Sequence, residues 1–264
     1  MTVNIIIPCY NQAQYLSEAI QSVVEQEYED WTLDIVIDAS PDDSLRIAQE
    51  WSYKFPDKIS VHNLTENVGL THARNYAIQL RHDEFLLFLD SDDMINWNYL
   101  THTVEVLNEN PDIGIAYTDT EHIGDSDGHW NHPEYSFFNL LKGNFLSYCS
   151  LIRRSMFDAV GGLDLSNRGG MEDYTLWVDM GAKGFYGKHI PIKLFYYRVH
   201  KDSMTQDENW IKLQNIYMSH IILRHPELYD TSWITKATSI IALVPPDFMM
   251  MDRKDRVKYL SNFS

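Results

Sequence analysis

A group of carboxylates follows directly after an apolar run in the first half of the chain. Phe85 to Leu89 are all apolar, and the sequence continues as Asp90-Ser91-Asp92-Asp93. Such a run is typical of a buried strand, and open α/β sheets bind their ligands at the carboxyl ends of strands. Two carboxylates one residue apart can present oxygens to a hard divalent cation such as Mg²⁺ or Mn²⁺. A metal site is therefore one hypothesis, and a polar turn with Asp93 as the cap of a following helix is the other.

The composition indicates a folded globular chain with an acidic surface. The 264 residues are 44% hydrophobic and 13% aromatic, enough for one large domain or a domain with an appendage. The formal net charge of -17 argues against binding to nucleic acid or to anionic lipid, since both need basic patches. No apolar run reaches the length of a transmembrane segment, and the first residues lack the basic region of a signal peptide. We therefore expect a cytoplasmic enzyme, with Cys9 and Cys149 as free buried thiols.

Four apolar strands that alternate with helices are expected to position the acidic group. The strands are predicted at 3–7, 33–37, 59–64 and 85–89, and the helices between them at 15–24, 44–55 and 71–80. This alternation predicts a parallel sheet built from right-handed crossovers. Polar residues gather after each strand, where a ligand would bind.

The pattern is less regular in the second half of the chain. Helices are expected at 99–108, 154–160 and 174–183, strands at 113–118, 145–152 and 194–199, and a polar loop at 125–132. Beyond the last strand the pattern is mostly helical, around 210–224 and 232–243. We expect this C-terminal extension to pack against the rest of the chain. A homodimer contact and contact with a membrane surface that carries a lipid-linked acceptor are the alternatives.

The first predicted strand is followed by Pro8-Cys9-Tyr10 and not by a glycine loop. The chain has no glycine before Gly69, so it has neither a dinucleotide-binding loop after its first strand nor a Walker-type phosphate loop. A bound nucleotide would therefore be recognised by side chains at the strand ends and by a metal ion.

Seven segments form a pattern that is more specific than any one of them. Four lie in the first half of the chain, at Ile5 to Asn11, Val36 to Ser44, Asn67 to Asn75 and Phe88 to Asp93. Three follow later, at Gly161 to Asp164, Glu172 to Trp177 and Tyr197 to His200. Together they resemble family 2 glycosyltransferases of the GT-A fold, over roughly residues 3 to 205.

The resemblance implies an α/β fold with a Rossmann-like, mainly parallel central sheet flanked by helices, and with a C-terminal helical extension. Residues 1–118 would form the half that binds the nucleotide sugar, and residues 119–205 the acceptor-binding half of the same domain. Residues 206–264 would form the extension.

The resemblance also implies a nucleotide site at the strand ends. The residues expected to contact the nucleotide are Pro8, Tyr10, Asn11, Asp38, Arg74, Asp90 and Ser91. Asp38 would accept a hydrogen bond from the ring N3–H of uracil or thymine, and Arg74 would lie beside the diphosphate. A turn carboxylate and a surface cation are the alternatives for these two residues. The chain departs from the family pattern at Ile37, which is usually polar, and at Ala39, which is usually glycine.

A metal site and a base complete the expected chemistry. Asp92 and His200 are implied to bind Mn²⁺ or Mg²⁺, which would neutralise charge on the leaving diphosphate, although a lone histidine can also be structural. Asp173 is the expected catalytic base, because inverting transfer needs a carboxylate that takes the proton of the attacking hydroxyl. Adjacent acids that stabilise a helix N-terminus are the alternative for Glu172 and Asp173.

Indole side chains offer a second kind of contact, because sugars stack their apolar faces on them. Glu172 and Trp177 are expected at the acceptor or in the loop around it, with core packing as the favoured alternative for Trp177. Trp130 and Trp210 are open between core packing and contact with a sugar.

The resulting hypothesis is an inverting glycosyltransferase that uses a nucleotide-sugar donor, expected to be UDP-linked. The acceptor would be a saccharide or a lipid-linked molecule, in cell-surface polysaccharide or glycolipid biosynthesis, and the enzyme would be cytoplasmic or peripheral at the inner face of the membrane. A non-catalytic nucleotide-sugar-binding module and a metal-dependent nucleotidyltransferase are the alternatives. The latter would call for a glycine-rich basic loop after the first strand, where this chain has Pro8-Cys9-Tyr10.

Overall fold

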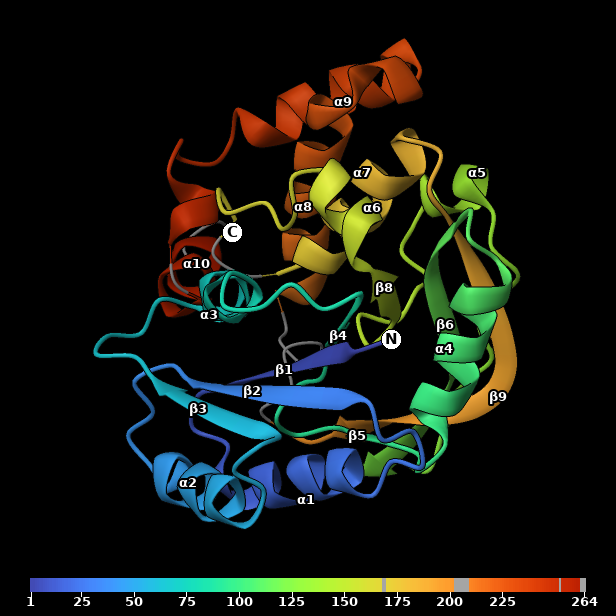
Figure 1. The fold of residues 1–264 in the computed structure, drawn as a ribbon. Helices are drawn as coiled ribbons and strands as arrows, with labels where there is room; N and C mark the ends of the chain where they lie inside the picture. Colours follow the sequence, from blue (N-terminus) through green and yellow to red (C-terminus); the bar gives the residue numbers. More distant parts are fainter. Residues whose placement is uncertain (168–169, 202–208, 252, 262–264) are drawn as a thin grey trace.

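A mixed β-sheet runs through the centre of the molecule, with helices on both of its faces (Figure 1). The computed structural model of the chain describes residues 1–167, 170–201, 209–251 and 253–261. Among these residues the strand order is β3-β2-β1-β4-β8-β6-β9-β5, with β7 paired to β6.

The first four strands form the parallel part of the sheet. They are β1 (Val3–Cys9), β2 (Trp31–Ile37), β3 (Ile59–Asn63) and β4 (Phe85–Phe88). The helices between them are α1 (Ala13–Val24), α2 (Ser44–Lys54) and α3 (Leu70–Ile78). Strand β1 pairs with β2 and β4, and β2 pairs with β3, all in parallel. This part of the prediction is confirmed, and it brings the carboxyl ends of β1, β2 and β4 to one edge.

The second half of the chain makes the sheet mixed. Its strands are β5 (Met94–Ile95), β6 (Ile113–Gly124), β7 (His129–Trp130), β8 (Leu151–Arg153) and β9 (Tyr186–Val199). Strand β8 is antiparallel to β4 and β6, whereas β9 is parallel to β6 and antiparallel to β5. The strand predicted at 145–152 is wrong over most of its length, because residues 145–148 turn toward a cavity and only the last residues pair.

Helices cover the two faces of the sheet in two groups. Because side chains alternate along a strand, Ile5 and Ile7 of β1 face α1, α2 and α4 (Tyr99–Glu109), whereas Ile6 faces the other way. The second face is covered by α3, α6 (Arg154–Ala159) and α7 (Glu172–Ala182), and α1 and α2 lie on the opposite side from these (Figure 1). A short helix, α5 (Phe137–Leu140), packs against α7. Cys9 and Cys149 are free and buried, as predicted.

The C-terminal extension packs on the face that carries α3 and α7 (Figure 1). Its helices are α8 (Trp210–Arg224), η2 (Pro226–Leu228), α9 (Thr231–Ile241), η3 (Phe248–Met250) and α10 (Arg253–Ser261). Ile221 of α8 lies in the core under the sheet, and Met171 contacts both that core and the apolar cluster of the extension. The expected packing of the extension against the rest of the chain is therefore confirmed. The predicted boundary between residues 205 and 206 lies outside the described residues.

The length and composition of the helices bear on membrane insertion. Within the described ranges, no helix combines the length and the apolar character that crossing a membrane requires.

A fully buried carboxylate lies inside the parallel part of the sheet. Asp34 of β2 accepts hydrogen bonds from Asn4 at 2.7 Å and from Arg81 at 2.8 Å, and it lies 2.7 Å from the ring of His62. Burial alone would raise the pKa of Asp34, but the hydrogen bonds from His62 and Asn4 and the charge of Arg81 outweigh it and lower the pKa. The carboxylate is therefore ionised and paired at neutral pH.

We expect Asp34→Ala to lower the free energy of unfolding by about 3 kcal/mol, because removing one member of a buried charge cluster leaves its partners unsatisfied. Urea unfolding at pH 7 measures this, and a loss under about 1 kcal/mol would contradict it. Asp43→Ala is the matched control, because Asp43 has only an exposed contact with Arg46. Since the folded pKa of Asp34 is lowered, its contribution is complete above the ordinary carboxyl pKa and is lost as pH falls through the folded value.

Candidate active site

A cavity of about 1130 Å³ opens at the carboxyl ends of β1, β2 and β4. The predicted site residues that line it are Pro8, Tyr10, Asp38, Arg74, Asp90, Ser91, Asp92, Glu172 and Asp173. His200 reaches the same place through a contact with Asp92. Asn11 and Trp177 are not part of the lining. The cavity therefore brings together residues from both halves of the chain.

The loop after β2 is organised by Asp38. The buried Asp38 carboxylate accepts hydrogen bonds from the backbone N–H groups of Val68 at 2.7 Å and Gly69 at 2.9 Å. These bonds fix the residues that lead into α3. The next residue, Ala39, has a left-handed φ of 53°, which is unfavourable for a residue with a β-carbon. This explains why glycine suits the position better.

The turn after β1 places two predicted residues differently. Tyr10 is half exposed and faces the cavity. Asn11 has a φ of 57° and donates its backbone N–H to Ser40 at 2.8 Å. Asn11 therefore shapes the turn, and its neighbour Gln12 lines the cavity.

The three acids after β4 have different environments. Asp93 is buried and accepts hydrogen bonds from the backbone N–H of Arg198 at 2.6 Å and from the Tyr148 hydroxyl. Burial, together with the charges of Asp92 and Asp90, raises the pKa of Asp93 well above its usual range. The prediction that Asp93 caps a following helix is wrong, because strand β5 follows it and α4 begins only at Tyr99.

Asp92 and His200 form a donor pair that suits a divalent cation. Oδ2 of Asp92 lies 2.9 Å from Nε2 of His200, although the two residues are 108 positions apart in the chain. Carboxylate oxygens of Asp90, Asp92 and Asp93 also lie within 4.8 Å of one another. Since Asp93 is held by internal hydrogen bonds, Asp92 and His200 are the residues that could hold the ion. An imidazole beside a carboxylate suits Mn²⁺ better than Mg²⁺.

A buried arginine joins the two halves of the site. Arg74 of α3 is only 1% exposed, and its guanidinium contacts Asp90 at 2.6 Å and Glu172 at 2.5 Å. Burial opposes the charge of Arg74, but the charges of Asp90 and Glu172 outweigh it and raise the pKa of Arg74. Burial raises the pKa of Asp90 to about 6. A surface cation on an amphipathic helix is therefore the wrong interpretation of Arg74.

Glu172 and Asp173 begin α7 and face different partners. Glu172 is buried and also accepts a hydrogen bond from the backbone N–H of Gly170 at 2.9 Å. Asp173 is partly exposed to the cavity, and Asn144 donates to its Oδ2 at 3.0 Å. Burial, reinforced by the charge of Glu172, raises the pKa of Asp173 to about 7. A carboxylate with this pKa can accept a proton near neutral pH.

Trp177 lies in the core. It is 0% exposed and packs under the sheet, so it does not contact a ligand in the cavity. The core alternative is confirmed for this residue, and an acceptor contact is wrong.

Two parts of the lining escaped prediction from the sequence. The strand predicted at 145–152 concealed Tyr148, and Asn144, directly before that segment, had no signal of its own. The extension contributes Trp210, Leu213, Gln214, Tyr217, Lys254 and Arg256. The tryptophan was the only available signal there, because the other residues are ordinary members of an amphipathic helix or a charged tail.

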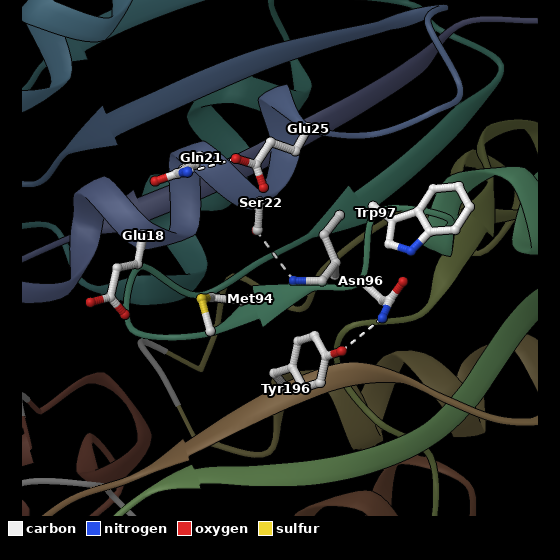
Figure 2. A pocket seen from close by; sticks show the side chains of 9 residues that line it. Glu18, Gln21, Ser22, Glu25, Met94, Asn96, Trp97 and Tyr196 are labelled. Carbon is white, nitrogen blue, oxygen red and sulfur yellow. Dashed lines mark hydrogen bonds between the residues drawn. The ribbon is translucent and has the colours of Figure 1, made fainter.

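A second hollow, of about 360 Å³, lies between α1 and β5 (Figure 2). Glu25 accepts a hydrogen bond from Gln21 at 2.6 Å, and Asn96 donates to the Tyr196 hydroxyl at 2.7 Å. Trp97 is exposed beside them. None of the predicted site residues lines this hollow, so the candidate active site is the larger cavity.

Comparisons with known proteins show the family to which the chain belongs. The sequence profile described as "Glycosyl transferase family 2" matches residues 4–171, more than half of the chain. The chain is 26% identical over 210 residues to the "Putative teichuronic acid biosynthesis glycosyltransferase TuaG" of Bacillus subtilis (strain 168), covering 78% of this chain and 82% of that protein. The chain spans less than two thirds of several other curated relatives, 62% of one and 10% of another.

Solved structures show the same fold at low sequence identity. S. aureus TarS 1-349 in complex with UDP-GlcNAc superimposes with a TM-score of 0.70 at 19% identity, covering 99% of this chain and 88% of that one. The mannosyltransferase PcManGT from Pyrobaculum calidifontis, in complex with GDP-Man and Mn²⁺, gives 0.67 at 17% identity, covering 99% and 79%.

The fold is therefore that of the GT-A glycosyltransferases, a sheet flanked by helices with the ligand site at the strand ends. The chain belongs to glycosyl transferase family 2.

We expect Asp92→Ala and His200→Ala each to weaken Mn²⁺ binding in the presence of UDP by about tenfold or more, because each removes one donor. Isothermal titration calorimetry measures the affinity. Glu25→Gln removes a carboxylate from the second hollow and serves as the control that should bind Mn²⁺ normally. Unaltered Mn²⁺ affinity in both Asp92→Ala and His200→Ala would exclude this donor pair.

Proposed function

We propose that this chain transfers a sugar from a nucleotide donor, a UDP-sugar, to a hydroxyl group of an acceptor, with inversion at the anomeric carbon. The observation that carries the proposal is the placement of the Asp92 and His200 pair and of Asp173 on one cavity. Membership of glycosyl transferase family 2 supports the reaction class. UDP-GlcNAc in TarS and GDP-Man with Mn²⁺ in PcManGT support a nucleotide-sugar donor.

The donor nucleotide binds at the ends of β1 and β2. Pro8 and Tyr10 contact the base and ribose, with Asn11 holding the turn that presents them. Asp38 contacts the base through the remaining lone pairs of its carboxylate, while its backbone partners keep it in place. Asp90 and Ser91 lie toward the ribose at the end of β4. Arg74 acts on this region by fixing Asp90.

The diphosphate needs positive charge in a chain whose formal net charge is -17. The guanidinium of Arg74 is already bound to two carboxylates, so it does not supply a full charge to the ligand. Asp92 and His200 would hold a divalent cation, which would supply that charge and neutralise charge on the leaving group. Asp92 follows β4 and His200 follows β9, and their side chains meet in a direct contact.

Asp173 acts as the base on the acceptor side. As the acceptor oxygen forms its bond to the anomeric carbon, the bond from that carbon to the diphosphate oxygen breaks, and the hydroxyl proton passes to the Asp173 carboxylate. Asn144 orients that carboxylate, and Glu172 holds the start of α7 through Arg74 and Gly170. One base and one cation suffice for an inverting transfer.

The name of one relative supports a role in cell-surface polysaccharide biosynthesis. TuaG carries teichuronic acid biosynthesis in its name, and it covers most of this chain. The contact between Asp92 and His200 and the position of Asp173 on the cavity argue against a non-catalytic binding module.

Asp173→Asn tests the base directly. We expect turnover to fall about 100-fold or more, because the amide cannot take the proton, while UDP affinity stays within about twofold. The assay is a panel of nucleotide sugars with Mn²⁺, scored by nucleotide release with and without added saccharides. Asp127→Asn, on an exposed carboxylate outside the cavity, is the control. Undiminished turnover would exclude Asp173 as the base, and no release from any donor by the wild type would favour the binding module.

The pH profile tests the same group independently. Because Asp173 must be ionised to act, and burial and Glu172 raise its pKa to about 7, kcat/KM should rise with pH up to this region and then level off. Glu172→Gln removes the neighbouring charge, so the midpoint should move to lower pH. A midpoint that stays in place or moves upward would contradict the assignment.

A further inference from the structure

One wall of the cavity has no part in binding the nucleotide or the metal as proposed above. It is formed by residues 130–133, which begin at the last residue of β7, and by residues 144–148. Its exposed residues are Trp130, Asn131, Pro133 and Asn144. A wall of this kind in a cavity larger than the nucleotide site points to a second ligand.

Trp130 dominates this wall. Its side chain is 45% exposed and lines the cavity. His122 packs edge-on against the indole, with ring centroids 4.4 Å apart at 84°, and Tyr197 lies at 5.2 Å and 36°. The pairing of β7 with β6 fixes the backbone beneath it. The indole is therefore held in one orientation while a large part of its surface stays open.

Two sets of contacts place Trp130 near the reacting groups. His132, two residues further along, lies 2.6 Å from the carbonyl oxygen of Phe145. Asn144, the residue directly before Phe145, donates a hydrogen bond to Asp173. On the other side, Tyr197 belongs to the strand that ends just before His200. Trp130 thus shares its wall with Asn144, which contacts Asp173, and it packs against Tyr197 of the strand that leads to His200.

We propose that Trp130 is the stacking platform of an acceptor subsite for a saccharide ring, and that Asn131 hydrogen-bonds the ring hydroxyls. A sugar ring has an apolar face of C–H groups and a polar edge of hydroxyls. A fixed indole face with an exposed amide beside it matches both. The polar residues Asn131, His132 and Asn144 in the same wall disfavour an acceptor bound through a lipid tail. This inference rests on the proposed function, because it assigns the acceptor side of that reaction.

Binding of neutral saccharides tests the subsite without requiring the natural acceptor. The probes are methyl β-glycosides of glucose, galactose and N-acetylglucosamine, with lactose and cellobiose, in the presence of UDP and Mg²⁺, which is diamagnetic. Saturation-transfer NMR and tryptophan fluorescence report binding. We expect at least one saccharide to bind the wild type, and Trp130→Ala to weaken it by about tenfold or more. Trp130→Tyr, which keeps an aromatic face, should restore most of the affinity.

Two controls separate the possible failures. Trp97→Ala removes an exposed indole from the second hollow (Figure 2) and should leave saccharide and UDP affinities as in the wild type. UDP affinity of Trp130→Ala within about twofold of wild type shows an intact donor site. Equal saccharide binding by the wild type and Trp130→Ala, or no binding of any saccharide by a wild type that binds UDP, overturns the subsite. Failure of the wild type to bind UDP overturns the proposed function instead.

Discussion

The buried guanidinium of Arg74 is the interaction on which the arrangement of the site depends. It joins Asp90, at the end of the central strand β4, to Glu172, at the start of α7. Without the Arg74 guanidinium, the carboxylates of Asp90 and Glu172 would face each other in a poorly solvated region, where their repulsion and desolvation would be costly. The same contact joins the first and second halves of the chain across the cavity. The Arg74 side chain therefore connects the carboxyl end of β4 to the start of α7.

Burial and hydrogen bonding divide the labour among acids that look alike in the sequence. Asp93 accepts hydrogen bonds from the backbone of Arg198 and from Tyr148. Asp90 forms an ion pair with Arg74, and Asp92 contacts His200. On α7, Glu172 is held by Arg74 and by the backbone of Gly170, while Asp173 faces the cavity. In the first group Asp90 and Asp92 stay partly exposed while Asp93 is buried, and on α7 Asp173 stays partly exposed while Glu172 is buried. Because the buried carboxylates are paired or hydrogen-bonded, several of them can lie close together without strong mutual repulsion.

Two loops beside the cavity have strained backbone conformations, and one of them packs against the C-terminal extension. Ala39 and Met171 both have left-handed φ values of 53°, one beside Asp38 and the other directly before Glu172. Such conformations persist only where the surrounding structure fixes them. Met171 is packed between the central core and the C-terminal cluster, and a β-carbon on Gly170 would come within 2.5 Å of the Tyr217 hydroxyl. The extension thus forms part of the framework around Glu172 and Asp173.

The sequence by itself determined the strands that alternate with helices, because apolar runs and helical spacing report local burial directly. It also determined which kinds of side chain follow the strands, from Pro8 to Asp92. Each of these positions lies in a run of several residues that together form a recognisable pattern. Only the tertiary structure decided which carboxylate is available, because burial and hydrogen bonding come from residues far away in the chain, such as Arg74 and Arg198. The wall at Trp130 and the contribution of the extension were likewise decided by packing, since a tryptophan or an arginine has the same local pattern whether it lies in a core or faces a ligand.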